Sequence, residues 1–122
     1  MPDSIEHLMR ANLIEVFNER DESRREAAIA ATYAEDVRWT DEDGVVTGRA
    51  ELATKCVQLQ ANLGESQFVA AGPVHQVPGF GHLAWNLVDP ATGATVMGGF
   101  DAALIKDGKI TDLWTVLIPP QP

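Results

Sequence analysis

The spacing of apolar residues changes once in this chain, near residue 66, and that change limits the folds open to it. Before this point, apolar side chains mostly recur at the three- and four-residue intervals of amphipathic helices. After it, they lie in extended runs separated by Gly, Pro and Asp turn signals, as in strands. Helices followed by a mainly antiparallel sheet predict an α+β domain. We expect the sheet to curl strongly around the helices, so that both apolar faces are buried.

The pattern also predicts the individual elements. Three helices are expected, over residues 4–19, over 23–33 after a capping box from Ser23 to Glu26, and from 49 to a stop at Gly64. The turn at Asp43-Gly44 should join two short strands, and Gly72-Pro73 should interrupt a long one. The expected strands cover residues 37–40, 45–47, 67–77, 81–88, 95–105 and 109–118.

Composition excludes several classes of protein. A chain of 122 residues is expected to form one domain over 1–122. Its net charge of −9 argues against nucleic acid and anionic membranes as partners. The single Cys56 leaves no internal disulfide or Cys-rich metal site, and no His pair has metal-ligand spacing. With no leader-like or membrane-length apolar segment, we expect a cytoplasmic protein without a metal or cofactor.

Two carboxylates stand in otherwise apolar, strand-like segments: Asp41 after Trp39, and Asp101 after Phe100. Burying a charged group is costly unless it is hydrogen-bonded, paired or protonated. Such groups concentrate where ligands bind or chemistry occurs. The pair therefore predicts a pocket, although Asp41 also suits an Asx turn before Gly44.

The last strand is apolar on both faces, with Leu113 and Leu117 on one and Trp114, Val116 and Ile118 on the other. A sheet with one solvated face should alternate. We therefore expect the outer face to form a homodimer, the alternative being cover within the monomer.

The register of the final hairpin has two readings. A tight turn at Asp107-Gly108 would place Asp101 opposite Trp114, and a bulge after a type I turn would place it opposite Leu113. We favour the bulge, with Leu113 and Thr115 inside and Trp114 outside.

The order of elements resembles the nuclear transport factor 2-like (NTF2-like) fold, a cone-shaped sheet around three N-terminal helices. The motifs that carry the match are residues 33–41, Gly48-Arg49, 99–101 and 107–110. Together they are similar to the SnoaL-like polyketide cyclase and ketosteroid isomerase branch. The resemblance implies a ligand pocket between the concave sheet and the helices.

The resemblance to ketosteroid isomerases implies that Asp41 is the general base. It also implies that Asp101 is the protonated acid that donates a hydrogen bond. The tyrosine that completes the oxyanion hole there corresponds to Leu13 here. Limonene-epoxide hydrolases use an Asp-Arg-Asp set, and the predicted strands near Asp101 in this sequence contain no Arg. Scytalone-dehydratase-like chemistry uses a His–acid pair, for which His75 and His82 are available.

The sequence thus predicts an enzyme that moves a proton beside a carbonyl without a cofactor: an isomerase, cyclase or dehydratase acting on a small apolar or cyclic molecule. The alternatives are a ligand-binding module and a dimerisation module with the same fold. The residues expected to bind substrate around the two acids are Leu13, Phe17, Trp39, His75, Trp85, Met97, Leu113 and Thr115.

Overall fold

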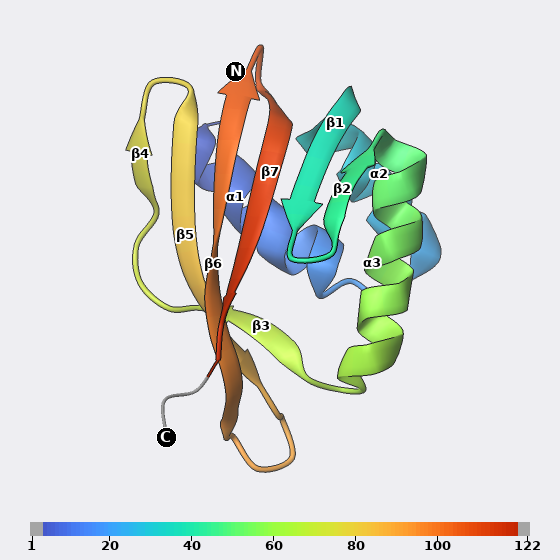
Figure 1. Ribbon diagram of the computed structural model, residues 1–122, viewed down its shortest axis with the longest axis vertical. Helices are drawn as coiled ribbons and strands as arrows, with labels where there is room; N and C mark the ends of the chain where they lie inside the picture. The colour runs from blue at the N-terminus through green and yellow to red at the C-terminus, as the bar shows by residue number, and fades with distance from the viewer. Residues whose placement is uncertain (1–3, 120–122) are drawn as a thin grey trace.

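The computed structural model describes residues 4–119 and is an α+β structure with a large mixed sheet (Figure 1). The helices are α1 (Ile5–Ala11), the π-helix η1 (Asn12–Phe17), α2 (Glu22–Thr32) and α3 (Arg49–Leu63). The strands are β1 (Tyr33–Asp41), β2 (Gly44–Thr47), β3 (Gln67–Ala70), β4 (His75–Val77), β5 (Phe80–Val88), β6 (Thr95–Lys106) and β7 (Lys109–Ile118).

The helices follow the predicted order, with two corrections at their ends. The first expected helix is α1 running directly into η1, so its second half is π-helical. The capping box at Ser23 is wrong, because Asp21 caps α2 by accepting from the backbone N–H of Arg24. Gly64 ends α3 at a positive φ of 61°, as predicted. None of the helices in residues 4–119 is both long and apolar enough to span a membrane.

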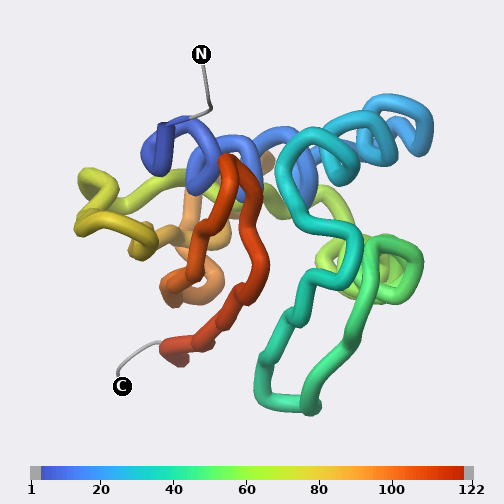
Figure 2. The backbone as a smooth tube through the Cα atoms, turned by 90° about the horizontal axis from the view of Figure 1, so that it is seen from above, coloured from blue at the N-terminus to red at the C-terminus, as the bar shows by residue number. Residues whose placement is uncertain are grey.

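The sheet has the order β2-β1-β7-β6-β5-β3, with β4 paired beside β3 along the same edge of β5. All pairs are antiparallel except β1 with β7. The helices lie along one side of this sheet (Figure 2). Its bending is less than the strong curl we expected. Register shifts bend strands. The shift in the β5–β6 pair lies near the end of the paired segment, at Leu87/Val88, and the shift in the β6–β7 pair also lies near an end, at Leu104/Ile105.

The register of the β6–β7 hairpin differs from both readings of the sequence. Asp107 and Gly108 form a two-residue turn with positive φ, and Lys106 pairs with Lys109. A bulge then leaves Thr111 unpaired and adds one residue to β7, so Asp101 lies opposite Thr115. Leu113 is fully buried and Trp114 is 38% exposed, so the two faces of β7 are as predicted even though the partner residue is not.

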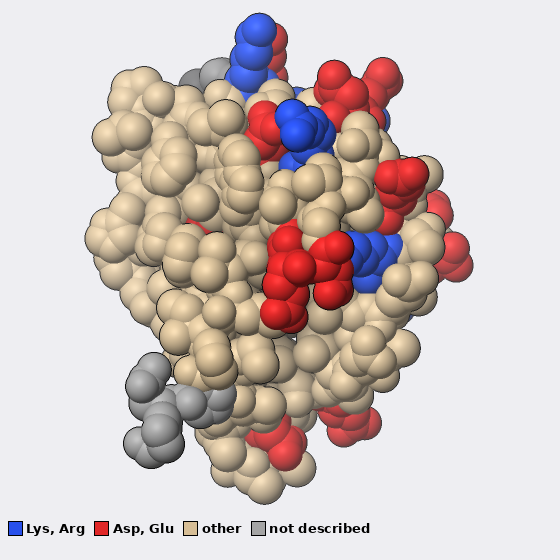
Figure 3. All heavy atoms as spheres, in the orientation of Figure 1, with Lys and Arg blue, Asp and Glu red and all other residues tan. Residues whose placement is uncertain are grey.

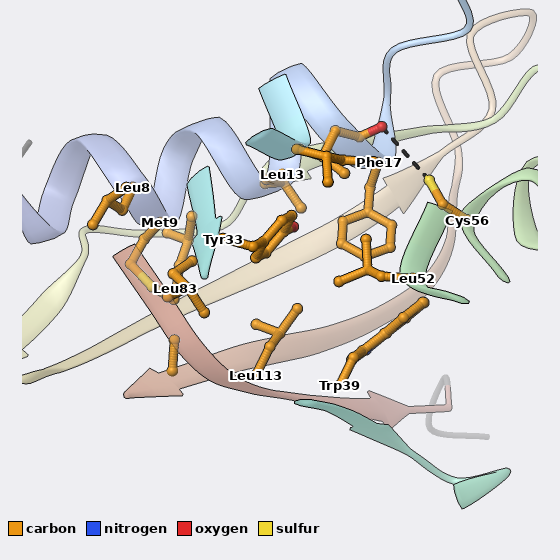
Figure 4. Packing of buried hydrophobic residues seen from close by; sticks show 14 of the residues in the cluster. Leu8, Met9, Leu13, Phe17, Tyr33, Trp39, Leu52, Cys56, Leu83 and Leu113 are labelled. Atoms are coloured by element: carbon orange, nitrogen blue, oxygen red, sulfur yellow. Dashed lines mark hydrogen bonds between the residues drawn. The ribbon is translucent and has the colours of Figure 1, made fainter. Parts of the chain in front are cut away.

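A buried apolar cluster joins the helices to the inner face of the sheet (Figure 4). Tyr33 lies in its middle, beneath the helical segment that carries Leu13. Inward positions of β5 alternate strictly with less buried outward ones. The helices therefore bury one face of the sheet and leave the other without cover from this chain.

Glycine is required at one point of this packing. A Cβ at Gly99 would lie 2.5 Å from the Trp85 ring and 2.5 Å from the Val116 carbonyl oxygen. At neighbouring Gly98 the nearest atom would be 3.4 Å away. The indole therefore approaches β6 this closely only because residue 99 has no side chain.

We predict that Gly99→Ala lowers the free energy of unfolding by about 1–3 kcal/mol, because the ring or the strand must move. The matched control Gly98→Ala should lower it by less than about 1 kcal/mol. Urea denaturation of both variants measures this, and equal losses would contradict the packing described.

Candidate active site

Asp101 is the buried acid of this structure. It lies in the middle of β6 with only 3% of its surface exposed. Its Oδ1 accepts hydrogen bonds from Thr115 Oγ1 at 2.9 Å and from Trp85 Nε1 at 3.3 Å. Its Oδ2 accepts from Asn12 Nδ2 at 2.8 Å. The carboxylate is thus held by donors from β7, β5 and the first helical segment, as a buried charge requires.

The surroundings act on the pKa of Asp101 in opposite directions. Burial raises it, because a desolvated carboxylate is less stable than the neutral acid. The hydrogen bonds from Thr115, Trp85 and Asn12 lower it. Burial is the larger effect, so the pKa rises to about 6. A carboxyl with such a pKa exchanges protons close to neutral pH, as general acids and bases do.

A second layer of polar groups holds the donors. Trp39 Nε1 donates to Thr115 Oγ1 at 3.1 Å, while the same hydroxyl donates to Asp101. The hydroxyl of Tyr33 donates to Asn12 Oδ1. Both Asn12 and Tyr33 are fully buried. The orientations of Thr115 and Asn12 are therefore each held by a partner on another element.

Asn12 is the first residue of the π-helix η1 and one of its buried residues. In η1 the backbone N–H of Asn18 bonds to the carbonyl of Leu13, five residues back. The buried residues of η1 are Asn12, Leu13, Val16 and Phe17. Single π-helical turns frequently occur at functional sites.

Next to Asp101 lies a small cavity with aromatic walls, about 20 Å³ in volume. That is room for about one water molecule. Rings meet edge to face around it, with centroids 5.0 Å apart for Phe17–Trp39 and 4.9 Å for Phe68–Trp85. A larger, open groove lies against α1 with lining from Glu6 and Arg10, and Asp101 does not line it. The residues lining the small cavity are Leu13, Phe17, Trp39, Leu59, Phe68, Trp85, Asp101 and Thr115.

Asp41 does not line this cavity. It lies where β1 turns into β2, and its Oδ1 accepts from the backbone N–H of Asp43 at 2.9 Å, forming an Asx turn. The same oxygen is 2.6 Å from Lys55 Nζ. That ammonium lies 5.0 Å from the ring centroid of Trp39, a cavity wall. The ion pair is thus outside the cavity, beside one of its walls.

Comparison with solved structures identifies the fold. A protein of Agrobacterium tumefaciens, provisionally named as an isomerase of the SnoaL-like family, superposes with a TM-score of 0.84 and 25% identity over 91% of this chain and 94% of that one. This chain has the SnoaL-like, NTF2-like fold. A provisionally named ketosteroid isomerase of Kribbella flavida (TM-score 0.71, 19% identity, 97% and 82% covered) has the same fold. So does a provisionally named SnoaL-like polyketide cyclase of Jannaschia (TM-score 0.74, 13% identity, 94% and 88% covered).

No protein-family model and no curated protein matches the sequence itself. The similarity to the SnoaL-like proteins is therefore one of architecture. The resemblance seen in the sequence is confirmed at that level, and the chemistry has to be argued from the side chains.

The structure separates the predicted site residues into two groups. Leu13, Phe17, Trp39, Trp85 and Thr115 surround the cavity with Asp101. The others lie elsewhere: His75 is exposed on β4, Met97 is half-buried on β6, and Leu113 belongs to the fully buried core.

Sequence reasoning missed Asn12, Tyr33, Leu59 and Phe68. Asn12 left a signal, because it follows Leu8 by four residues and is therefore a polar residue on the apolar stripe of the helix. Within residues 4–119, no group of three or more His, Cys, Asp or Glu residues could hold a metal ion.

The raised pKa predicts how stability depends on pH. The unfolded chain releases the Asp101 proton near pH 4, and the native state releases it near pH 6. Between these values the native state binds more protons, so Asp101 makes folding less favourable as pH rises. Relative to Asp101→Asn, the wild type should lose roughly 2 kcal/mol of unfolding free energy between pH 4 and 7.

Urea denaturation at several pH values measures this difference. The control Glu42→Gln removes an exposed acid and should keep the wild-type pH dependence. Parallel curves for the wild type and Asp101→Asn would show that Asp101 titrates as an ordinary surface acid.

Proposed function

We propose that this protein is a cofactor-independent acid–base enzyme of the SnoaL-like, ketosteroid isomerase-like type. It would move a proton on a small apolar carbonyl or cyclic molecule, as an isomerase, cyclase or dehydratase. The observation that carries the proposal is Asp101, a buried carboxyl with a pKa of about 6 on the wall of an aromatic cavity. The group titrates where a general acid or base works best.

The hydrogen bonds of Asp101 leave room for a ligand or a proton. An ionised carboxylate offers about four acceptor positions. Thr115, Trp85 and Asn12 fill three of them. Asp101 would therefore take a proton from an acidic carbon when ionised, or donate one to a carbonyl oxygen when neutral.

Asp41 is the second base in this proposal. Its carboxylate is engaged by Lys55 and by the Asx turn, and its side chain is 15% exposed. It could act on a ligand only after the Lys55 ammonium has moved away. We therefore assign the first proton transfer to Asp101 and a supporting role to Asp41.

The lining indicates the class of ligand. Its apolar walls are Leu13, Leu59 and four aromatic rings, and it includes no Lys or Arg. Because an anion would meet the Asp101 carboxylate without a compensating cation, the ligand should be neutral, compact and apolar. A cavity of about 20 Å³ must widen to admit a ring.

The second candidate function is a small-molecule binding module without catalysis. The small cavity and the position of Asp41 outside it favour this reading. The fold itself favours neither, since one fold hosts many functions.

We also propose that the outer face of the sheet forms a homodimer. Trp114, Val116 and Ile118 are 38%, 40% and 46% exposed on β7. The sheet face over β4–β7 is nearly free of charged side chains in Figure 3. Exposed apolar patches flanked by charged surface are typical of protein interfaces.

The enzyme proposal predicts proton exchange. Wild-type protein in D₂O should speed the loss of the α-proton NMR signals of cyclohexanone or 1-indanone. Asp101→Asn should slow this exchange by about 100-fold or more, the usual contribution of a general base. The control variant is Asp112→Asn, which removes an acid of β7 two residues before the outward-facing Trp114. It should exchange the ketone protons at the wild-type rate.

The wild type could instead exchange ketone protons only at the rate of buffer alone while the ketone shifts the NMR signals of cavity residues. That result would contradict the enzyme and favour the binding module. If the protein shows neither proton exchange nor ketone-induced shifts, both functions are contradicted and a dimerisation module is favoured.

The dimer proposal predicts a change of mass in solution. Wild-type protein should elute with twice the chain mass in size-exclusion chromatography with light scattering, and Trp114→Glu should elute as a monomer. Ile14→Glu places an acid at an apolar residue that is 50% exposed on η1, and it should leave the dimer intact. A monomeric wild type would refute the interface.

A further inference from the structure

Two buried polar groups lie behind the proposed proton-transfer group and outside its cavity. Asn12 and Tyr33 are both 0% exposed, and neither lines the cavity. Asn12 bonds to Asp101 through Nδ2 and to the Tyr33 hydroxyl through Oδ1. A chain of hydrogen bonds therefore runs from β1, through the first turn of η1, to the carboxylate on β6.

The direction of this chain follows from what each group can donate. The amide of Asn12 can present either its NH₂ or its carbonyl oxygen to Asp101. If the amide turned over, its oxygen would leave the Tyr33 hydroxyl, whose proton would then lack an acceptor in a dry core. An unsatisfied buried donor costs about 1–3 kcal/mol. Tyr33 thus holds the NH₂ side towards Asp101.

We propose that Tyr33 is a positioning residue that acts through Asn12: by fixing the orientation of the amide, it sets the protonation equilibrium of the Asp101 carboxyl. An NH₂ group can bond to the carboxylate and offers no acceptor to the neutral acid. Tyr33 therefore favours the ionised form of Asp101 without touching it or the ligand. Without its hydroxyl, the amide could turn and accept a hydrogen bond from protonated Asp101.

Among residues 4–119, the other groups in contact with this chain of hydrogen bonds are neutral near pH 6. The donors that face Asp101 from β5 and β7, Trp85 and Thr115, are neutral. Burial, and then the charge of Asp101, hold the pKa of Tyr33 well above its usual value. Burial raises the pKa of Cys56, whose charged form would interact with Tyr33, to about 11. A change near pH 6 thus reports on Asp101.

The inference rests on the proposed function for its catalytic meaning, but its test does not need catalysis. The pKa of Asp101 is measured by carboxyl NMR titration in the wild type, Tyr33→Phe, Asn12→Leu and the double variant. Tyr33→Phe should raise this pKa by about one, the worth of one hydrogen bond. In the Asn12→Leu background, Tyr33→Phe should change nothing further, because the connecting amide is gone.

The control Thr111→Val deletes a hydroxyl of β7 that bonds to the backbone of Leu104, and should leave the pKa of Asp101 unchanged. An unchanged pKa in Tyr33→Phe, or the same rise with and without Asn12, would overturn the inference. If the titrations show the expected coupling but the protein exchanges no ketone protons, the proposed enzyme is refuted. The positioning role of Tyr33 then still stands.

A second readout needs only Tyr33→Phe, should Asn12→Leu not fold. In the wild type, cross-relaxation between the Asn12 NH₂ and the Trp85 indole N–H should persist at every pH, because both donate to one carboxylate. In Tyr33→Phe it should weaken below the pKa of Asp101, as the amide turns over. Cross-relaxation that is constant with pH in the variant would also overturn the inference.

Discussion

The burial of the Asp101 carboxylate depends on donors that reach it from separate parts of the chain. Asn12 comes from the first helical segment, Trp85 from β5 and Thr115 from β7. Removing the Asn12 amide would leave Oδ2 without a donor, at a cost of about 1–3 kcal/mol. The pairing of β5, β6 and β7, the bulge at Thr111 and the packing of the first helical segment on the sheet must all be correct for the set to close. The polar network and the apolar packing therefore specify the same arrangement.

Asp41 and Asp101 look alike in sequence and differ in the structure. Asp41 ends its strand at a turn, where the Asp43 backbone and the Lys55 ammonium can reach it. Asp101 lies in mid-strand, where neighbouring strands supply only neutral donors. A carboxylate beside a cation at a surface stays an ion pair, whereas one among neutral donors in a dry core keeps a raised pKa. Asp101 therefore lies among neutral donors in the dry core with a raised pKa, and Asp41 lies in an ion pair with Lys55.

Cavity size and chemistry together define what the protein can bind. The aromatic walls pack against one another edge to face, and they leave about 20 Å³ beside Asp101. Gly99 allows Trp85 to lie against β6, and Trp85 in turn donates to Asp101. Because the rings form both the wall and part of the hydrogen-bond network, the proposed function implies that admission of a ligand and titration of the acid would be coupled. A ligand that displaces water from the cavity would raise the pKa of Asp101 further.

The sequence by itself determined the α+β class, the order of elements and the inward face of each long strand, since these follow from apolar periodicity and turn residues. It also pointed to Asp101, because a charge among core residues stands out in a linear chain. The tertiary structure decided what sequence spacing cannot encode: the partner of Asp101 across the hairpin, the removal of Asp41 and His75 from the cavity, and the approach of Asn12 and Tyr33. A bulge shifts the register by one residue without a distinct local signal, and a hydrogen bond between residues 89 positions apart exists only once helix and sheet have packed.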